Sequence, residues 1–587
     1  HSYLKKGQDI VDMNHKAIDA GATAYKKFDV PADWADAQDT ADTTVLSGKA
    51  ELVEQVKTIL DPVGRMDGDS LPVSAFVKHV DGQFELGASA YEKRGVAVTV
   101  PTWDAAKCIQ CNNCAYVCPH ATIRPYALTE EEAAKAPAAA KIVDIKAGKG
   151  KGVYKYTMAV SPLDCMGCAV CVGQCPVGAL TMVPQEDEAA QQDVFNYCVA
   201  EVSEKKDMQD NTVKGSQFRQ PMLEFSGSCA GCAETSYARL ITQLFGDHMY
   251  ISNATGCSSI WGGPAATSPY CTNKEGHGPA WSNSLFEDNA EHGLGMLLGQ
   301  QATRSRLADK IRELSGVTES AEKKAACEEY LATMEDYEAN KAAIAKLLPL
   351  LEADPDCQYS KAILADKEYL GKKSMWVFGG DGWAYDIGFG GVDHVLASGN
   401  DINIFVFDTE VYSNTGGQAS KASNIGQVAQ FAASGKEIKK KSLAEIAMSY
   451  GYIYVAQVAM GANPAQTLKA IQEAEAYHGP SLIIGYAPCE MHSIKGGMMN
   501  CQKEMKKAVE CGYWNLFRFN PAAEGAKFTL DSKEPKGGYQ EFLMNEARYS
   551  RLTREFPDRA SELFQRNEKA AMDRYEHLLK LKAMYEG

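Results

Sequence analysis

The sequence predicts an α/β domain, whose mostly parallel sheet has helices on both faces, and a smaller α+β domain. Three observations support this fold class. Apolar, β-rich runs alternate with helical segments between residues 220 and 515, as βαβ units require. Two Cys-rich runs lie upstream, between residues 101 and 200. The composition, with 45% hydrophobic and 23% charged residues, is typical of a globular protein.

Length and charge limit the class of protein. A chain of 587 residues has room for about four domains. The net charge of −16 argues against nucleic acid or an anionic membrane as the main partner. The best apolar run, residues 452–462, is too short to span a membrane. The first residues, HSYLKKGQDI, contain neither an initiator Met nor an apolar signal-peptide core, so we expect part of a longer, cytoplasmic polypeptide.

We expect the domains in a definite order along the chain. They are the end of an upstream α/β domain (1–40), a linker domain ending in YEKRGVAVTVP (41–100), an α+β domain with the Cys-rich runs (101–200), a linker (186–220), the α/β domain (220–515) with a helical insertion (303–370), and a C-terminal arm and helix (520–587).

Within the α/β domain, four apolar runs are expected as strands: residues 375–378, 402–407, 452–458 and 482–486. In the C-terminal helix, apolar residues recur along one side, which predicts packing against a neighbouring domain or subunit. These residues are Leu563, Phe564, Tyr575, Leu578 and Leu579.

Eight of the 18 cysteines form two runs of identical spacing, C-x2-C-x2-C-x3-C-P. This is the bacterial ferredoxin pattern, in which each run supplies three thiolates to one [4Fe–4S] cluster and lends its fourth to the other. Zinc knuckles and disulfides are alternatives, but two complete runs favour iron–sulfur. One cluster is predicted to use Cys108, Cys111, Cys114 and Cys175, and the other Cys165, Cys168, Cys171 and Cys118. The repeat is also an internal duplication.

A further pair, Cys229 and Cys232, lies in SGSCAGCAET, and Cys257 follows in NATGCSS. A lone CxxC is compatible with a redox dithiol, half a zinc site or half a cluster. The three cysteines together suggest a third cluster that lacks one ligand. Cys489 is the best fourth ligand, because it directly follows a strand-like run.

A glycine-rich loop follows another predicted strand, in SMWVFGGDGWAYDIGFGG. Gly380 and Gly382 let the backbone approach a phosphate, and the helix expected to begin near Trp383 favours negative charge at its N-terminus. The next strand ends in DTEVYSN. Both loops therefore lie at the carboxyl ends of parallel strands, where open α/β sheets bind ligands. The Asp381 carboxylate, the Thr409 hydroxyl and the Val411 carbonyl could complete a Mg²⁺ site with two diphosphate oxygens.

The two loops fit the thiamine diphosphate signature, which pairs GDG with an Asn-containing strand end. Thr409 stands where the metal-binding Asn is usual, and Asn414 follows in the same loop. A surface turn is the alternative interpretation of GDG alone. Neither GxGxxG nor the Walker A motif occurs, which argues against a nicotinamide site.

Taken together, these motifs resemble the pyruvate:ferredoxin (flavodoxin) oxidoreductases, and the chain resembles the carboxyl-terminal half of their long single-chain form. The matching stretches are EKRG at residues 92–95, GSCAGCAETSYARL, NATGCSSIWGG, NSLFEDNAEHG, SNTGGQASKAS and LDSKEP. The resemblance implies that Cys229, Cys232, Cys257 and Cys489 hold a cluster beside the thiamine, and that Asp381, Thr409 and Val411 hold Mg²⁺. The implied thiamine diphosphate contacts are Glu234, Cys257, Gly380, Asp381, Gly382, Trp383, Thr409, Glu410, Val411, Tyr412, Ser413 and Asn414.

The resemblance further implies an enzyme that decarboxylates pyruvate oxidatively, with coenzyme A as acetyl acceptor and ferredoxin or flavodoxin as electron acceptor. Asn414 is the expected polar group near the reacting carbon, with a turn role as the alternative. The implied partners are the missing amino-terminal half and a second copy in a homodimer. An oxidoreductase for another 2-oxoacid and a non-catalytic polyferredoxin remain competing hypotheses.

Overall fold

The structure is a computed structural model that describes residue 4 and residues 7–37, 46–146, 152–264 and 267–586. It divides into two units, His1–Lys49 and Ala50–Gly587. In the first unit, α1 (Gln8–Gly21) and η2 (Ala32–Asp36) bury none of their side chains. All elements described below belong to the second unit.

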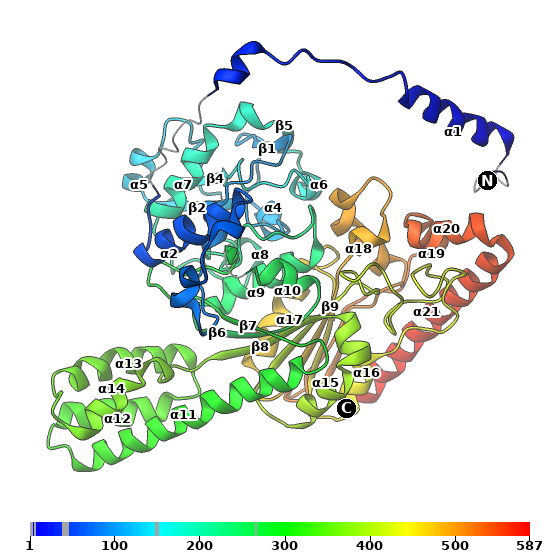
Figure 1. The fold of residues 1–587 in the computed structure, drawn as a ribbon. Helices are drawn as coiled ribbons and strands as arrows, with labels where there is room; N and C mark the ends of the chain where they lie inside the picture. The colour runs from blue at the N-terminus through cyan, green and yellow to red at the C-terminus, as the bar shows by residue number, and fades with distance from the viewer. Residues whose placement is uncertain (1–3, 5–6, 38–45, 147–151, 265–266, 587) are drawn as a thin grey trace. The chain divides into compact units, whose positions relative to one another are not determined.

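The second unit is built around an eight-stranded sheet with the order β13-β12-β10-β11-β9-β8-β6-β7 (Figure 1). The neighbouring pairs from β10 to β7 are parallel, whereas β12 and β13 pair antiparallel. The predicted mostly parallel sheet is thus confirmed. The strands are β6 (Met249–Ala254), β7 (Ala280–Ser284), β8 (Ser374–Gly380), β9 (Asn403–Asp408), β10 (Tyr454–Val458), β11 (Ser481–Tyr486), β12 (Phe517–Phe519) and β13 (Phe528–Leu530).

The four apolar runs expected as strands form β8 to β11 at the centre of this sheet. Every residue of β9 and β11 is buried, as continuous apolar runs in a parallel sheet covered on both faces should be. β6 and β7 were not expected, because their sequences MYISNA and AWSNS interrupt the apolar pattern with Ser and Asn. Within β6, the buried Ser252 hydroxyl donates to the side chain of Asn289 over 2.7 Å, which satisfies its polar group inside the core.

Helices cover both faces of the sheet, as predicted. On one face, Tyr237 of α9 packs against Phe405 of β9. On the other, Gly293 of α11 lies so close to Val377 of β8 that a Cβ there would come within 2.6 Å of the valine side chain. The helices of this domain are α9 (Ala233–Phe245), α10 (Cys257–Gly262), α15 (Phe389–Ala397), α16 (Leu443–Met448), α17 (Pro464–Ala476) and α18 (Cys501–Glu510).

The region of the two Cys-rich runs forms a smaller α+β domain with two antiparallel sheets, β1-β5 and β2-β4-β3. Its strands are β1 (Thr99–Trp103), β2 (Ile123–Leu128), β3 (Val143–Asp144), β4 (Lys155–Val160) and β5 (Leu180–Pro184). The short helices α4 (Asn113–Tyr116) and α6 (Val170–Gln174) each follow the second cysteine of a run.

The predicted internal duplication extends to backbone conformation. In the first run, Gln110, Asn112 and Ala121 have φ between 56° and 62°. At the equivalent positions of the second run, Gly167, Ala169 and Gly178 have φ between 58° and 67°. Non-glycine residues rarely adopt this left-handed conformation, so its recurrence at three matched positions shows that both halves fold as copies of one unit.

The stretch expected as a linker, residues 186–220, contains α7 (Gln191–Glu201) and α8 (Val213–Ser216). Val194, Phe195 and Cys198 of α7 are buried in a core shared with Leu128 and Ala159 of the small domain. The sequence did not predict α7, because only one face of this helix is apolar and its other positions are mostly polar.

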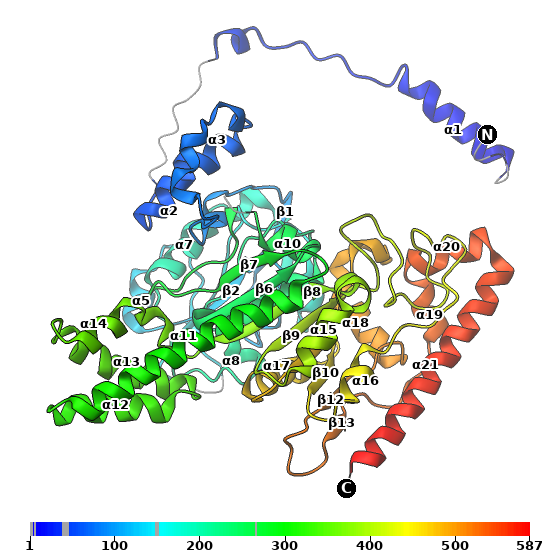
Figure 2. The same ribbon diagram turned by 60° about the horizontal axis from the view of Figure 1, so that its bottom comes forward.

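The helical insertion consists of the far end of α11 and three further helices packed against it, and it carries a core of its own (Figure 2). Its first helix begins earlier than expected, within the α/β domain. The helices are α11 (Asn289–Val317), α12 (Ala321–Thr333), α13 (Tyr337–Glu352) and α14 (Gln358–Ala365).

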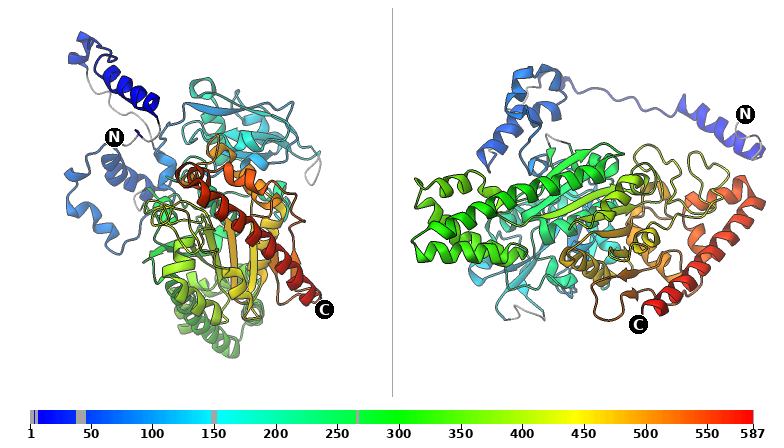
Figure 3. Two further views of the ribbon diagram at one scale, coloured as in Figure 1. Left: turned by 90° about the vertical axis from the view of Figure 1, so that its right-hand side faces the viewer. Right: turned by 90° about the horizontal axis from the view of Figure 1, so that it is seen from below.

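The C-terminal region adds the antiparallel strands β12 and β13 and ends in three helices, the last of which is long (Figure 3). Leu563, Phe564 and Leu578 of α21 are buried in the main core, whereas Leu579 is exposed, which corrects its expected place in the stripe. The helix contacts β13 and α20 of the same chain. These helices are α19 (Tyr539–Met544), α20 (Ala547–Glu555) and α21 (Pro557–Tyr585).

Candidate cofactor site

The carboxyl ends of four neighbouring parallel strands carry the predicted site residues. β6 leads to Cys257, β8 to Asp381, β9 to Thr409 and β11 to Cys489. Because these strands lie side by side and run in the same direction, the loops that follow them meet at one edge of the sheet.

The three oxygen groups predicted to bind a cation converge at the two central loops. The Thr409 hydroxyl lies 2.9 Å from the Asp381 carboxylate and 2.9 Å from the Val411 carbonyl oxygen. The Thr409 backbone N–H also donates to Asp381 over 3.1 Å. A carboxylate, a hydroxyl and a carbonyl are hard donors, as Mg²⁺ prefers.

The electrostatics of Asp381 fit a bound cation. Its side chain is fully buried, and burial together with the nearby Asp408 raises its pKa to about 8. The Ser420 hydroxyl donates to its second oxygen over 2.6 Å. Lys440 offsets this rise in pKa only in part, because its ion pairs are with Asp408 and Glu410. A divalent cation beside Asp381 would therefore supply the positive charge that an ionised, buried carboxylate needs beside it.

The glycine-rich loop leaves space beside its backbone. A Cβ added at Gly380 would meet only the Phe407 carbonyl oxygen, at 3.9 Å, whereas one at Gly382 would come within 2.6 Å of the Tyr412 ring. The helix expected near Trp383 begins as a π-helical turn, η11 (Gly382–Ile387), and α15 follows it. Such turns are frequent at functional sites.

Glu234 lies near the start of α9, where its buried carboxylate accepts a hydrogen bond from the Trp261 indole over 2.8 Å. Burial raises its pKa to about 7. The charge of Glu234 contributes to the raised pKa of three thiols, those of Cys232, Cys257 and Cys489. Glu234 therefore lies beside the third set of cysteines.

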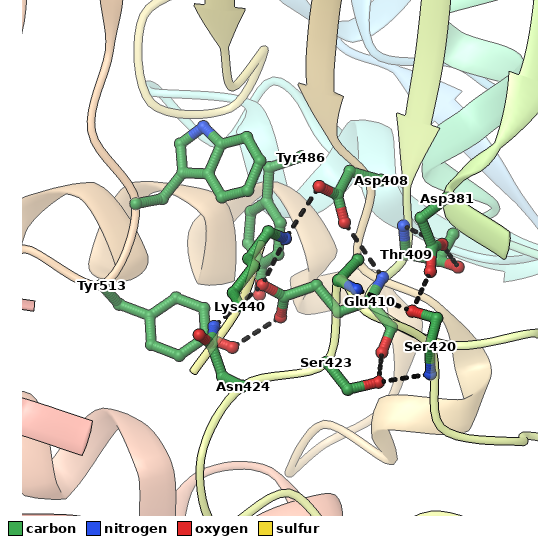
Figure 4. A network of polar contacts seen from close by, with 12 residues as sticks. Asp381, Asp408, Thr409, Glu410, Ser420, Ser423, Asn424, Lys440, Tyr486 and Tyr513 are labelled. Carbon is green, nitrogen blue, oxygen red and sulfur yellow. Dashed lines mark hydrogen bonds and ion pairs between the residues drawn. The ribbon is translucent and has the colours of Figure 1, made fainter. Parts of the chain in front are cut away.

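The side chain of Glu410 points into a buried ionic network rather than toward the Asp381 loop (Figure 4). It pairs with Lys440 over 3.0 Å and with Arg548 over 2.7 Å, and it accepts a hydrogen bond from Asn424. Burial pushes its pKa upward, but Lys440 and Arg548 outweigh burial and lower the pKa to about 2. The charged carboxylate thus anchors the Thr409 loop to this network. The φ of Glu410 is 60°, in the left-handed region that non-glycine residues rarely adopt.

Cys229, Cys232, Cys257 and Cys489 are brought together although they are far apart in sequence. The pKa of the Cys489 thiol is raised first by burial and then by Glu234, Cys257 and Cys229. That of Cys257 is raised by burial, Glu234, Cys232 and Cys229. Cys257 also touches the Thr409 loop, since its sulfur lies 3.2 Å from the Ser413 hydroxyl.

The two Cys-rich runs are arranged crosswise. The pKa of the Cys114 thiol is raised by burial and then by Cys111, Cys108 and Cys175. That of Cys168 is raised by burial, Cys118 and Cys165, and Cys118 likewise influences Cys171. Each fourth cysteine thus lies with the other run's first three, as the ferredoxin pattern predicts.

Backbone N–H groups point at several of these sulfurs. Gln110 donates to Cys108 over 3.3 Å, Gly167 to Cys165 over 3.4 Å and Ala179 to Cys175 over 3.1 Å. Hydrogen bonds of this kind stabilise thiolate ligands and help set cluster potentials. In the described part of the chain, no group of three or more His, Cys, Asp or Glu side chains is close enough for a single metal ion.

Asn414 is exposed in a turn that the Gly417 N–H closes by donating to the Tyr412 carbonyl over 2.9 Å. Its surroundings therefore match the turn role that was the alternative to contact with the reacting carbon. Tyr412 and Ser413 are half-buried in the same turn, so they lie closer to the Asp381 loop.

Three family profiles match the chain. Residues 361–484 match the family described as thiamine pyrophosphate enzyme, C-terminal TPP binding domain. Residues 107–179 match the family described as 4Fe-4S dicluster domain. Residues 43–97 match a third family, EKR, whose description is "domain of unknown function".

Curated relatives match almost the whole chain. The pyruvate-flavodoxin oxidoreductase of Klebsiella pneumoniae is 49% identical over 98% of this chain and 49% of its own length. The pyruvate:ferredoxin oxidoreductase of Moorella thermoacetica is 50% identical over 99% of this chain and 50% of its own length. The mitochondrial pyruvate dehydrogenase [NADP(+)] of Euglena gracilis is 45% identical over 99% of this chain and 32% of its own length.

The chain is therefore similar, over nearly all of its residues, to one half of pyruvate:ferredoxin and pyruvate-flavodoxin oxidoreductases. It spans about half the length of the curated oxidoreductases that it matches. Among the residues that the structure describes, none of the helices combines the length and apolarity needed to cross a bilayer.

Sequence reasoning missed several residues that build this candidate site. Lys440 and Arg548 hold Glu410, and Ser420 holds Asp381. His492, three residues after Cys489, contacts the Thr409 carbonyl through its ring Nε2 over 2.7 Å and so joins the cysteine loop to the β9 loop. Burial lowers the pKa of His492 to about 3 and keeps the ring neutral. Lone polar residues in loops carry no spacing signal, so only the fold reveals them.

Proposed function

We propose that this chain is the cofactor-bearing half of an enzyme that converts pyruvate and coenzyme A into acetyl-CoA and carbon dioxide. Two electrons and a proton are released in this oxidation, and the electrons leave through three [4Fe–4S] clusters to ferredoxin or flavodoxin. The identity to oxidoreductases of that description over nearly the whole chain supports the substrate class.

One observation carries the proposal. The third set of cysteines adjoins the candidate diphosphate site, since Cys257 contacts Ser413 and the loop of Cys489 contacts Thr409 through His492. An electron acceptor beside the site of decarboxylation distinguishes an oxidising enzyme from one that only removes carbon dioxide.

Bound thiamine diphosphate would supply an electron sink for the decarboxylation of a 2-oxoacid. Asp381, the Thr409 hydroxyl and the Val411 carbonyl would hold Mg²⁺ against the diphosphate. Gly380 lets the backbone approach the phosphates, and Tyr412 closes over Gly382. Glu234, Trp383, Ser413 and Asn414 are the further proposed contacts.

The cysteine residues would hold the clusters in three sets. Two sets are formed crosswise by the Cys-rich runs, and the third by Cys229, Cys232, Cys257 and Cys489. Hydrogen bonds from backbone N–H groups to the sulfurs, including Met491 to Cys489 over 3.5 Å, favour the thiolate forms.

Two other functions compete with this one. An oxidoreductase for another 2-oxoacid would share every feature described here, because the residues that contact the acid are expected mainly in the rest of the polypeptide. A polyferredoxin without catalysis would not need Asp381 buried beside Thr409 and Val411, and this oxygen set favours the enzyme.

Further partners follow from the proposal. The rest of the polypeptide and a second copy of the enzyme would complete the active site. We place the enzyme in the cytoplasm, because reducing conditions preserve thiolate-bound clusters.

Analysis of iron, sulfide and thiamine in the full-length protein purified without oxygen tests the proposal. Three four-iron clusters require about twelve irons per chain, together with one thiamine. About eight irons would remove the third cluster and with it the proposed oxidation. Turnover with pyruvate, 2-oxoglutarate and an aryl pyruvate then identifies the acid.

The variant Cys489→Ser tests the third cluster directly. We expect it to lose about four irons while both other clusters remain reducible by dithionite. Pyruvate should no longer reduce those clusters. Full reduction by pyruvate in this variant would contradict the proposed path, and Cys511→Ser, a buried cysteine outside all three sets, is the control.

A further inference from the structure

The EKR segment, residues 87–95, lies at the end of the region that matches the family of unknown function. It contains Glu92, Lys93 and Arg94, and it leads into β1 of the small domain. Its contacts reach two separate cysteine loops, and the proposed function gives it no role.

On one side, the EKR segment is tied to the chain that enters the second Cys-rich run. Lys93 pairs with Asp164 over 2.6 Å, and the Asp164 side chain is only 2% exposed. The Gly95 N–H donates to the Leu163 carbonyl over 2.8 Å. Asp164 directly precedes Cys165, so Lys93 holds the start of a cluster loop.

On the other side, the same segment holds the chain that leads to Cys229. Arg94 donates to the Ser226 carbonyl over 3.4 Å, and the Lys93 ammonium lies 5.0 Å from the centre of the Phe225 ring. The Ser89 hydroxyl donates to the Glu224 carbonyl over 3.0 Å. Ser226 is three residues from Cys229.

The junction between the two sides is tightly packed. Ser89, Glu92, Arg94, Asp164 and Phe225 line a cavity of only ≈ 10 Å³. Phe225 donates from its backbone to the His120 carbonyl, two residues beyond Cys118, over 3.0 Å. Neighbouring residues of one short segment thus contact the chain beside Cys165 and the chain beside Cys229.

The second Cys-rich run and the Cys229 loop also approach each other at a second place. A Cβ at Gly173, within the second run, would lie 2.9 Å from the Met499 carbonyl, and one at Gly231 would lie 2.8 Å from the Met498 side chain. The turn η13 (Met498–Asn500) therefore touches both loops. The cluster of Cys165, Cys168, Cys171 and Cys118 is consequently the neighbour of the third cluster.

We propose that Lys93 and Arg94 are positioning residues that fix the separation between the third cluster and the cluster of the second Cys-rich run. This inference rests on the cluster sets of the proposed function, and it assigns a role in electron transfer to the EKR segment. Neither residue touches a cluster; both act through Asp164, Phe225 and Ser226.

The test compares Lys93→Met and Arg94→Gln, singly and combined, in the full-length protein with its clusters loaded. Lys93→Arg keeps the charge and the reach to Asp164 and should restore wild-type behaviour. Lys78→Met is the matched control, because Lys78 lies in the same matched region but pairs with Glu54 where both side chains are exposed. Iron and sulfide content establishes loading before any comparison.

Two readouts report the separation. The first is the magnetic splitting between clusters in the electron paramagnetic resonance spectrum of the fully reduced protein, and we expect the double variant to lose it. The second is the rate at which pyruvate-derived electrons reach the clusters of the Cys-rich runs in a single turnover. We expect this rate to fall about tenfold, since geometric errors of about 1 Å cost up to about 100-fold in position-sensitive steps.

Unchanged splitting and rate in the loaded double variant would overturn the inference. So would a shifted potential of one cluster at constant splitting, because that result means a charge effect rather than positioning. If the double variant loses iron, the magnetic splitting and the single-turnover rate are measured on Arg94→Gln alone. A wild-type protein with about eight irons would instead refute the proposed third cluster itself, and the inference with it.

Discussion

Asp381 shows how burial can prepare a residue for a cation. Its carboxylate is held by Thr409 and Ser420, while the Lys440 ammonium pairs with Asp408 and Glu410. Within the described residues no cationic side chain forms an ion pair with Asp381, so Mg²⁺ bound to a diphosphate would be the cation that compensates its charge.

Replacing Asp381 by Asn should remove the negative charge that favours a cation, and with it the binding of Mg²⁺ and thiamine diphosphate. We expect affinity to fall at least about 100-fold, since an unmatched charge in a buried site costs about 3 kcal/mol or more. Quenching of intrinsic tryptophan fluorescence on titration with the coenzyme and Mg²⁺ measures the effect. Asp393→Asn, on α15 outside the loop, serves as control, and equal affinity in both variants would refute the role.

Glu475 offers a pH dependence away from the cofactors. It lies on α17 and accepts hydrogen bonds from Ser374 over 2.7 Å, Asn403 over 2.9 Å and Trp376 over 3.2 Å. Burial raises its pKa to about 7. An acid with a raised folded-state pKa stabilises the fold fully only below its unfolded pKa of about 4.3, and the contribution is lost as pH rises through 7.

The variant Glu475→Gln should therefore remove a pH-dependent loss of up to about 3 kcal/mol between pH 4.5 and 7.5. The Tm of the wild type should fall relative to that of the variant as pH increases over this range. Differential scanning calorimetry at matched loading of the clusters measures both. Parallel Tm curves would contradict the raised pKa, and Glu576→Gln, an exposed glutamate on α21, controls for the change of net charge.

At the scale of elements, the crosswise exchange of cysteines makes the strongest prediction. Cys175→Ser should damage the cluster of the first run, although Cys175 belongs to the second. Combined with Cys108→Ala, it should still cost one cluster, leaving about eight irons; combined with Cys165→Ala, it should cost two, leaving about four. Iron analysis distinguishes the pairs, and the reverse order would show that each run closes on itself.

The elements also show what a sequence can reveal. Strands β8 to β11 were predictable because a parallel sheet covered on both faces demands uninterrupted apolar residues. β6 and β7 were not, because Ser252 is satisfied by Asn289, a partner 37 residues away. The two ferredoxin-type cysteine sets followed from spacing and the third from the family resemblance, whereas the π-helical turn at Gly382 depends on packing of Tyr412 and Trp383 that no local pattern encodes.

At the scale of the whole molecule, the C-terminal region supports the loop that follows β9. Arg548 of α20 pairs with Glu410 and Glu546, and it donates to the Tyr486 hydroxyl over 3.1 Å. Residues more than a hundred positions apart thus share one buried charge network. Single-sequence reasoning could not find it, because the charges are adjacent only after folding.

Arg548→Met should destabilise the protein by about 3–5 kcal/mol, because it leaves Glu410 and Glu546 buried without their guanidinium. We expect a lowered Tm and weaker binding of thiamine diphosphate together, since the network carries the β9 loop. Arg551→Met on the same helix removes only an exposed pair with Glu555 and should change stability by less than about 0.5 kcal/mol. Similar losses in both variants would deny the network its structural role.

The matched backbone of the two Cys-rich runs has a consequence for how such a unit could exist alone. One copy would surround its own cluster with three thiolates and hold a fourth that nothing uses. Two identical copies facing each other across a twofold axis would repair both deficits at once. The small domain therefore has the form of a symmetric pair whose partners have become consecutive stretches of one peptide.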